Sequence, residues 1–422
     1  MQSSNKNSYI TSLFLVGCLY FIFGFITWLN GTLIPFLKTA CELNNFQSYF
    51  VTFAFFISYF VMAIPSSAIL KKTGFKKGMS LGLLVMAVGA IIFIPAAMQR
   101  SFPLFLLGLF TQGLGLSILQ TAVNPYVTIL GPEESAAQRI SIMGIANKAA
   151  GILIPILIAS ILLNNIDSIN EQVLAATDTA AKDQLLNELA NRIINPYIIV
   201  TVTLVILALL IRISPLPEVN DEEENPDTEQ GHSSISQHPY LFLGAIAIFF
   251  YVGVEVLAGD SIISYGTYQQ IPMERAKFFT SLTLGCMVGG YFLGILLTPK
   301  VISQETALKI CAVLGILFTI GVLTTTGMTS VFFLAALGFA HSIMWPAIWP
   351  MSLKGLGRHT KRGAAYLIMG IAGGAILPLI YGAMGDVMNL QSAYILMIPC
   401  YLYILYFAVK GHMVGYKEKI QK

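Results

Sequence analysis

The sequence predicts an all-α membrane protein with twelve transmembrane helices, arranged as two pseudo-symmetric halves of six. Of the 422 residues, 56% are hydrophobic and only 11% are charged, and the mean hydropathy is +0.74. A water-soluble domain carries about 25% charged residues, so this composition excludes a soluble enzyme, a disordered chain and a nucleic-acid-binding protein. The division into halves is indicated by one acidic linker near the middle of the chain and by a residue pattern that occurs once on each side of it.

Apolar segments long enough to cross a bilayer follow one another along the whole chain. A transmembrane helix needs about 20 mostly apolar residues. The runs are continuous rather than alternating, which excludes a transmembrane β-barrel. The first run is too long for a cleavable signal peptide, so we expect it to remain as a span. The twelve segments begin near Tyr9, Phe46, Gly78, Pro103, Arg139, Pro196, Tyr240, Arg275, Thr306, Ser330, Lys361 and Gln391.

The distribution of Lys and Arg predicts the orientation of these spans, because basic residues concentrate in cytoplasmic loops. With twelve spans and the N-terminus inside, 17 of the 24 basic residues lie on the cytoplasmic side, six lie outside, and one, Lys148, lies within a span. We therefore expect both termini to be cytoplasmic.

A long external connection covers residues 165–195. It contains a short amphipathic helix, and we expect this helix to lie on the surface of the bundle or of the membrane; a gate is the alternative. Its apolar face consists of Leu185, Leu186, Leu189 and Ile193.

A second long connection, residues 216–238, is cytoplasmic, acidic and rich in turn-forming residues, as is typical of a linker. It divides the chain into an N-terminal half, 1–215, and a C-terminal half, 239–422. The segment IMGIA around Met143 recurs around Met369, 226 positions later. Two six-helix repeats joined by a linker are the architecture of major facilitator transporters, which bind substrate near the membrane midplane between the repeats.

Three charged residues lie within spans: Lys148 in the fifth, and Glu255 and Asp260 in the seventh. A charge in a span costs at least about 2.5–3.5 kcal/mol and marks ion or substrate pathways. The three formal charges sum to −1, which leaves room for one cation, so the sequence predicts a coupling site for H⁺ or for Na⁺ near the two acids. The alternative is a structural Lys–carboxylate pair beside an ordinary protonated acid.

The spacing of the two carboxylates sets a condition on this site. On a regular helix they point about 140° apart, so they share a face only if the turn at Gly259 loosens. A further acid, Asp386, lies at the outer end of the eleventh span, and we expect it to be merely interfacial.

Neutral polar residues on three spans predict a binding site for a hydroxyl-rich ligand, because an amide both donates and accepts hydrogen bonds. Any one of them alone is better explained by hydrogen bonding between packed helices; their grouping on three spans makes the binding site an equally good explanation. The candidates are Thr27 and Asn30 in the first span, Gln120 and Asn124 in the fourth, and Asn147 in the fifth.

The tenth span adds two tryptophans and a histidine. Trp345 and Trp349 lie on one helix face, where flat rings suit the C–H face of a pyranose; packing or the interfacial aromatic belt is the alternative. His341, one turn earlier, could bind substrate or titrate, although a lone intramembrane histidine is more often structural.

The sequence closely resembles the bacterial fucose/glucose/galactose symporter family of the major facilitators, over about residues 10–410. The resemblance implies uptake of a hexose with H⁺ or Na⁺ across the bacterial inner membrane by alternating access. It implies a monomer that binds sugar, a coupling cation and lipid, with no cofactor. The segments that carry it are FGFITWLNGTLIPFLK, LQTAVNPYVTILGPEESAAQRISIMGIANKAAG, YVGVEVLAGD and MWPAIWP.

The family's functional residues carry over only in part. Fucose-type members have an Asn-Asp pair in the first span, which here is Asn30-Gly31, and a fourth-span glutamate, which here is Gln120 as in glucose-type members. Asn147 matches the family's fifth-span asparagine, which is implicated in sugar binding. Since both fucose-type coupling acids are absent, we expect coupling at the seventh-span acids, and glucose, galactose or mannose as substrate rather than fucose.

Other functions fit the residues less well. An efflux antiporter of the same fold would have a broader and more apolar site than these amides form. An enzyme is not expected, because the sequence has no HExxH, no Gly-rich phosphate loop and no Ser/His/Asp set. A sugar sensor that does not transport would carry an added signalling domain, for which we expect neither terminus to be long enough.

Overall fold

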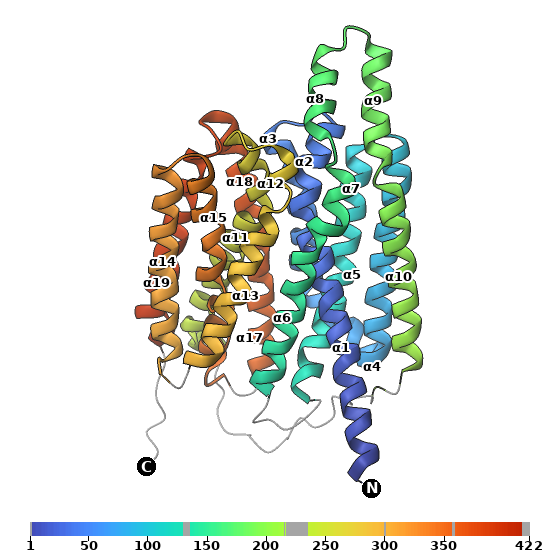
Figure 1. Cartoon of the computed structure of the whole chain (residues 1–422). Helices are drawn as coiled ribbons and strands as arrows, with labels where there is room; N and C mark the ends of the chain where they lie inside the picture. The colour runs from blue at the N-terminus through green and yellow to red at the C-terminus, as the bar shows by residue number, and fades with distance from the viewer. Residues whose placement is uncertain are drawn as a thin grey trace, which may run out of the picture.

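The structure is a bundle of long helices that run nearly side by side (Figure 1). It is a computed structural model, and within the ranges it describes every regular element is a helix. The ranges are residues 2–129, 136–214, 216, 235–298, 301–356 and 359–415.

The described residues of the first half form ten α-helices. The fifth span contains one π-helical turn, Pro155–Ala159, between α6 and α7. The helices are α1 (Gln2–Trp28), α2 (Asn30–Ala40), α3 (Asn45–Ser48), α4 (Phe50–Met98), α5 (Phe102–Ile129), α6 (Ala136–Ile154), α7 (Ser160–Leu162), α8 (Ile166–Ala175), α9 (Thr179–Asn191) and α10 (Ile194–Ile213).

In the second half, the part that the structure describes forms nine α-helices, with 3-10 turns before and within the last two spans. The helices are α11 (Pro239–Tyr268), α12 (Met273–Ala276), α13 (Phe279–Leu297), α14 (Gln304–Thr324), α15 (Gly327–His341), α16 (Met344–Leu353), α17 (Thr360–Met369), α18 (Gly373–Val387) and α19 (Met397–Val409); the 3-10 turns include η5 (Gly370–Ala372) and η6 (Ser392–Leu396).

The described helices are compatible with twelve spans. Eleven helical stretches are long and apolar enough to cross a bilayer. One of them, α4, has 49 residues and a break at Gly74, where φ is 75° and ψ is 170°; glycine adopts such a backbone at little cost. At about 1.5 Å per residue its 49 residues would form a straight helix of about 74 Å, roughly twice the thickness that one span must cross. The two parts of α4 therefore account for two spans.

The two halves repeat one helix crossing. A Cβ atom added to Gly24 would lie 1.8 Å from the carbonyl oxygen of Asn147, and one added to Gly373 would lie 1.8 Å from that of Phe249. Asn147 and Gly373 are 226 positions apart, which is the spacing of the sequence repeat. The first and fifth spans, and likewise the seventh and eleventh, thus touch backbone to backbone, as small residues allow in membrane bundles. The predicted linker lies largely outside the described residues, so the boundaries of the halves stay a prediction.

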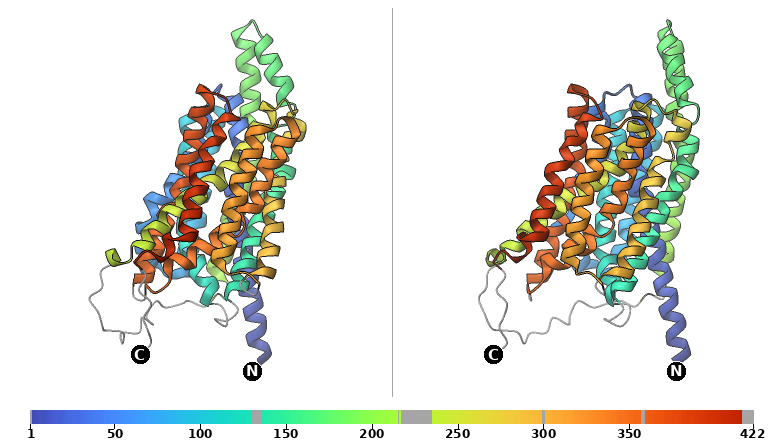
Figure 2. Two further views of the ribbon diagram at one scale, coloured as in Figure 1. Left: turned by 90° about the vertical axis from the view of Figure 1, so that its left-hand side faces the viewer. Right: turned by 60° about the vertical axis from the view of Figure 1, so that its left-hand side comes forward.

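Helices α8 and α9 form a hairpin that projects beyond the bundle, clearly visible from two directions (Figures 1 and 2). The expectation that this amphipathic segment lies on the bundle or membrane surface was therefore wrong. Its apolar residues Leu186, Leu189 and Ile193 are buried near the base of α9. Helices α9 and α10 run in nearly the same direction, with only Arg192 and Ile193 between them. The span formed by α10 is therefore continued by α9 beyond the bundle.

The hairpin distinguishes the two ends of the bundle. We call the end with α3, α8, α9 and α12 the hairpin end. The opposite end, where α1 begins and α19 ends, we call the terminal end (Figure 1).

Candidate functional site

A pocket lies between the two halves, in the middle part of the bundle. In this conformation the pocket is nearly closed: its cavity volume is about 20 Å³, well below the roughly 300–1,000 Å³ typical of small-molecule sites. Its lining comes from α4, α5, α16, α17 and η5, and consists of Tyr59, Ser117, Gln120, Thr121, Asn124, Trp345, Trp349, Ile368 and Ile371.

The pocket has an aromatic wall and a polar wall. On the C-terminal half, Trp345 and Trp349 stack with ring centroids 5.0 Å apart and planes 22° from parallel. On the N-terminal half, Gln120 Nε2 donates to the Tyr59 hydroxyl at 3.1 Å, and Asn124 Oδ1 accepts from a tyrosine hydroxyl of α1 at 2.6 Å. The structure thus brings four of the predicted substrate residues to one pocket.

The other four predicted substrate residues do not line this pocket. Asn147 Nδ2 donates to the backbone carbonyl of Tyr20 at 3.4 Å. Asn30 is fully buried, and neither of its amide atoms has a hydrogen-bond partner among the described residues. Thr27 lies one turn before Asn30 on the first span, which is divided into two helices at Leu29.

His341 is buried within the C-terminal half. Its Nε2 is 2.6 Å from the hydroxyl of Tyr401 on α19. This hydrogen bond gives the Nε2 atom a partner within the C-terminal half rather than in the pocket. It favours the structural role expected of a lone intramembrane histidine.

Lys148 and Glu255 form an ion pair between the halves. Their side chains are 10% and 12% exposed, and Lys148 Nζ lies 2.8 Å from Glu255 Oε1. The Lys148 ammonium also lies over the ring of Trp28, 4.4 Å from its centroid, a favourable position for a cation. The pair is therefore both charge-compensated and shielded by an aromatic ring.

Asp260 makes a separate contact with the N-terminal half. It is 1% exposed, and its Oδ2 accepts a hydrogen bond of 3.2 Å from the Thr52 hydroxyl of α4. Because α11 is helical from Pro239 to Tyr268, the loosened turn that a shared face requires at Gly259 is not present. The two acids thus have partners on different helices, α6 for Glu255 and α4 for Asp260.

Tyr251 joins the pocket to the ion pair. It is buried one turn before Glu255 on α11, within hydrogen-bonding reach of that carboxylate, and its ring centroid is 6.3 Å from that of Trp345. Tyr251, Tyr59 and Thr52 were not predicted from the sequence, although the i, i+4 spacing of Tyr251 and Glu255 could have pointed to Tyr251.

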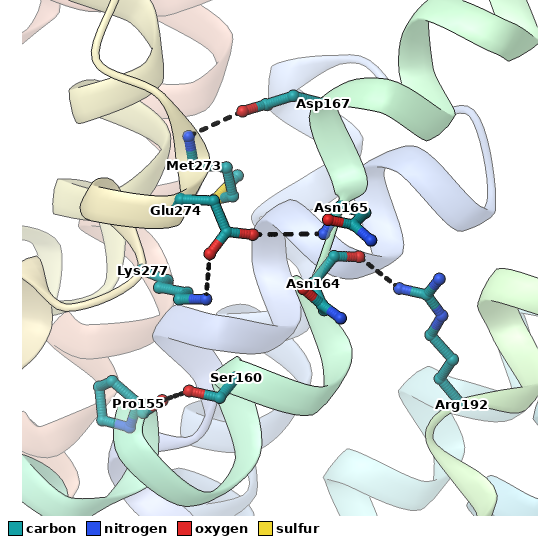
Figure 3. A network of polar contacts seen from close by, with 9 residues as sticks. All are labelled: Pro155, Ser160, Asn164, Asn165, Asp167, Arg192, Met273, Glu274 and Lys277. Atoms are coloured by element: carbon teal, nitrogen blue, oxygen red, sulfur yellow. Dashed lines mark hydrogen bonds and ion pairs between the residues drawn. The ribbon is translucent and has the colours of Figure 1, made fainter.

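Carboxylates from one half also cap helices of the other at the hairpin end (Figure 3). Asp167 of α8 accepts from the backbone N–H of Met273 at 2.8 Å, and Glu274 of α12 accepts from the backbone N–H of Asn165 at 3.3 Å. Asp167 therefore stabilises the start of α12, and Glu274 stabilises the start of α8. Helix N-termini have free N–H groups and a partial positive charge, which favour a nearby carboxylate.

Asp386 makes a third contact of this kind. Its carboxylate accepts from the backbone N–H groups of Asn45 and Phe46 at 3.1 and 2.8 Å, and from the Asn45 side chain at 2.7 Å. The expectation that Asp386 is merely interfacial was therefore incomplete, since this residue of α18 binds the start of α3 in the other half. Contacts across the halves at this end could not be predicted from the sequence, because the partners lie far apart along the chain.

In the described part of the chain, no group of three or more His, Cys, Asp and Glu side chains is placed to hold a metal ion. The five cysteines are free thiols and are buried or partly buried.

Comparison with known proteins identifies the family. The family model described as Major Facilitator Superfamily matches residues 16–378. A glucose/galactose transporter of Brucella abortus is 34% identical over 413 residues, covering 97% of this chain and 96% of the relative. The L-fucose-proton symporter of Escherichia coli K12 is 29% identical over 96% of this chain and 94% of the relative.

A solved structure supports the same relationship. The crystal structure of the transporter FucP in the outward conformation aligns with a TM-score of 0.72 and 28% identity, over 95% of this chain and 98% of that one. The chain belongs to the Major Facilitator Superfamily, and within it to the fucose/glucose/galactose:cation symporter family.

Proposed function

We propose that this protein takes up a hexose such as glucose, galactose or mannose together with H⁺ or Na⁺, by alternating access. The observation that carries the proposal is the pocket between the halves, in which stacked tryptophans face amide side chains. Aromatic rings bind the C–H faces of sugars, and amides match their hydroxyl groups as donors and acceptors. The names of the relatives, a glucose/galactose transporter and an L-fucose-proton symporter, support the same substrate class.

Three charged residues, Lys148, Glu255 and Asp260, form the coupling group in this proposal. Tyr251 lies between the ion pair and the tryptophan wall, so a change in the charge or position of the pair can alter the sugar pocket. Asn147, Asn30, Thr27 and His341 do not line the pocket in this conformation. For the first three we propose contact with sugar in other stages of the cycle, whereas the bond of His341 to Tyr401 favours a structural role.

The contacts at the hairpin end support a conformation that is closed on that side. We propose that the hairpin end faces outward and the terminal end faces the cytoplasm of a bacterial inner membrane, as the Lys and Arg distribution predicts. The relative FucP is described in an outward conformation, so the two structures would represent opposite stages of one transport cycle. The protein acts as a monomer and not as an enzyme in this proposal, with no cofactor beyond the coupling ion.

The test is uptake of radiolabelled hexoses into proteoliposomes under an imposed pH gradient or an imposed Na⁺ gradient, with unlabelled sugars as competitors. We expect accumulation above equilibrium with one of the two gradients and competition by glucose, galactose or mannose. Uptake that ignores both gradients, or drug efflux without sugar uptake, would contradict the proposal.

A tryptophan variant tests the pocket itself. Trp345→Ala removes one of the two stacked rings, and an aromatic contact is worth about 0.5–1.5 kcal/mol, so we expect sugar affinity to fall about two- to thirteenfold in equilibrium dialysis. Trp345→Phe is the matched control, because it keeps a flat ring and is expected to retain most of the affinity. Equal affinities for wild type and Trp345→Ala would show that the sugar binds elsewhere.

A further inference from the structure

We infer that Asp260, and not Glu255, takes up the coupling cation, and that its neutralisation allows the hairpin end to close. The inference rests on the proposed symport and assigns different tasks to the two acids of α11. It names one positive charge as the ligand, which H⁺ and Na⁺ can both supply.

Glu255 already has a permanent counter-charge. Its partner Lys148 lies at 2.8 Å in a largely buried setting, and the ring of Trp28 adds a second favourable contact for the ammonium. A cation that bound Glu255 would have to displace this ammonium and leave it buried without a partner, which is strongly unfavourable. The pair is therefore neutral as it stands and has no need of a further ion.

Asp260 lacks such a counter-charge. It is 1% exposed, and among the described residues no Lys or Arg forms an ion pair with it. Its hydrogen bond from Thr52 is neutral, and one neutral hydrogen bond does not offset the burial of a bare carboxylate. The excess charge of −1 in the coupling group thus resides at Asp260, and this buried arrangement requires one positive charge there.

The neighbours of Asp260 in the described part of the chain include no fixed cation that could take this role. From α2, Gly31 is so close that an added Cβ would lie 3.3 Å from the Asp260 Cα. Tyr49, directly before α4, and Thr52 of α4 also face it, and Glu255 lies five residues earlier on α11. None of these neighbours carries a positive charge, and the single hydrogen bond from Thr52 is the only one of these contacts that favours the charged carboxylate.

The position of Asp260 links this charge to the conformation. Its contacts with Gly31 and Thr52 belong to the interface between the halves, on the part of α11 that leads to the hairpin end. When the halves separate at that end, Asp260 becomes accessible to water, where a charged carboxylate is well solvated. A charged Asp260 therefore favours the open hairpin end, and a neutralised Asp260 favours the closed one. Binding of the cation to Asp260 is thereby coupled to closure of the hairpin end after sugar has entered.

Asp260→Asn tests the inference, because asparagine mimics the neutral state and cannot bind and release the cation. In proteoliposomes we expect the accumulation ratio to fall to the value without a gradient, while exchange of internal for external sugar continues. Retained exchange shows that the variant is folded. Glu171→Gln on the exposed hairpin is the matched control and is expected to accumulate sugar as wild type does.

The conformation is read from the distance between spin labels at Gln47 and Met388, measured by pulsed electron resonance. In wild type, removal of the coupling ion should increase the fraction of the long, open distance, by raising pH if the ion is H⁺ or by removing Na⁺ if it is Na⁺. Asp260→Asn should remain closed under both changes. Asp260→Glu, which keeps the acid, should restore the response at least in part.

Different failures have different meanings. If wild type neither exchanges nor accumulates any sugar, the proposed function is wrong. If wild type accumulates sugar and Asp260→Asn does so equally well, or if the variant still opens when the ion is removed, only the role of Asp260 is wrong. Loss of accumulation with retained exchange in Glu255→Gln, and not in Asp260→Asn, would assign the cation to Glu255 instead.

Discussion

The two halves of this protein are joined in two regions by different chemistry. In the middle of the bundle the polar contacts described above are buried: the pair Lys148–Glu255 and the hydrogen bond between Thr52 and Asp260. At the hairpin end the contacts are carboxylates that cap helix N-termini of the opposite half, and they are largely exposed. Both regions use acids, but only in the middle is the charge removed from water.

The two kinds of contact differ in the free energy that is lost when they break during a transport cycle. An exposed cap is worth about 0.5–2 kcal/mol, so it can break and form again as the halves move. A buried charge that loses its partner costs about 3–5 kcal/mol, so its compensation must be maintained through the cycle. We therefore expect variants in the middle to affect folding and coupling, and variants at the hairpin end to shift the balance between conformations.

The largest effect is expected for Glu255→Gln, which leaves Lys148 as a buried charge without a partner. We expect the free energy of unfolding to fall by about 3–5 kcal/mol, measured by denaturation of the purified protein in detergent. The matched control is Asp260→Asn, which replaces a neutralised acid and should cost much less. Equal losses in the two variants would contradict the contrast between the acids.

A smaller effect is expected when caps at the hairpin end are removed. Asp386→Ala and Asp167→Ala each delete acceptors for backbone N–H groups of the opposite half. Each should destabilise the closed hairpin end by about 1 kcal/mol, which corresponds to about a fivefold increase in the open-to-closed ratio, read from spin-label distances. An unchanged ratio in both variants would show that the caps do not hold this end closed.

The smallest effect is expected for Arg100→Ala, which removes an ion pair with Asp183 at 2.9 Å. This pair lies at the same end but within the N-terminal half, and exposed pairs contribute about 0–1 kcal/mol. We expect stability to change by less than about 1 kcal/mol and the open-to-closed ratio to stay as in wild type. A shift as large as that of Asp386→Ala would indicate that charge, rather than capping across the halves, controls this end.

The sequence was sufficient for the features that follow from hydrophobicity and from repetition. The spans, their division into two pseudo-symmetric halves and the family could all be predicted, because apolar length and the repeat around Met143 and Met369 are local patterns. The pocket was predicted in part: Gln120, Asn124, Trp345 and Trp349 do come together.

Contacts between distant segments could not be predicted. The sequence left open whether Lys148 pairs with Glu255, since nothing in either helix determines which faces meet. The exchange of caps between Asp167 and Glu274 depends on two short helices that no periodicity reveals. The amphipathic pattern of α9 correctly indicated an apolar face, but that face covers only the base of the helix, and the direction of the remainder is set by its continuity with α10.

The hairpin of α8 and α9 also has a practical consequence. The stretch from Thr179 to Ile213 has 35 residues, and at about 1.5 Å per residue it is roughly 52 Å long, about 20 Å more than the hydrocarbon core of a bilayer. The projecting hairpin offers an antibody fragment a helical epitope outside the detergent belt. For a transporter of 46.0 kDa with little mass outside the lipid, such a fragment would supply the asymmetric feature that aligns particle images in electron cryomicroscopy.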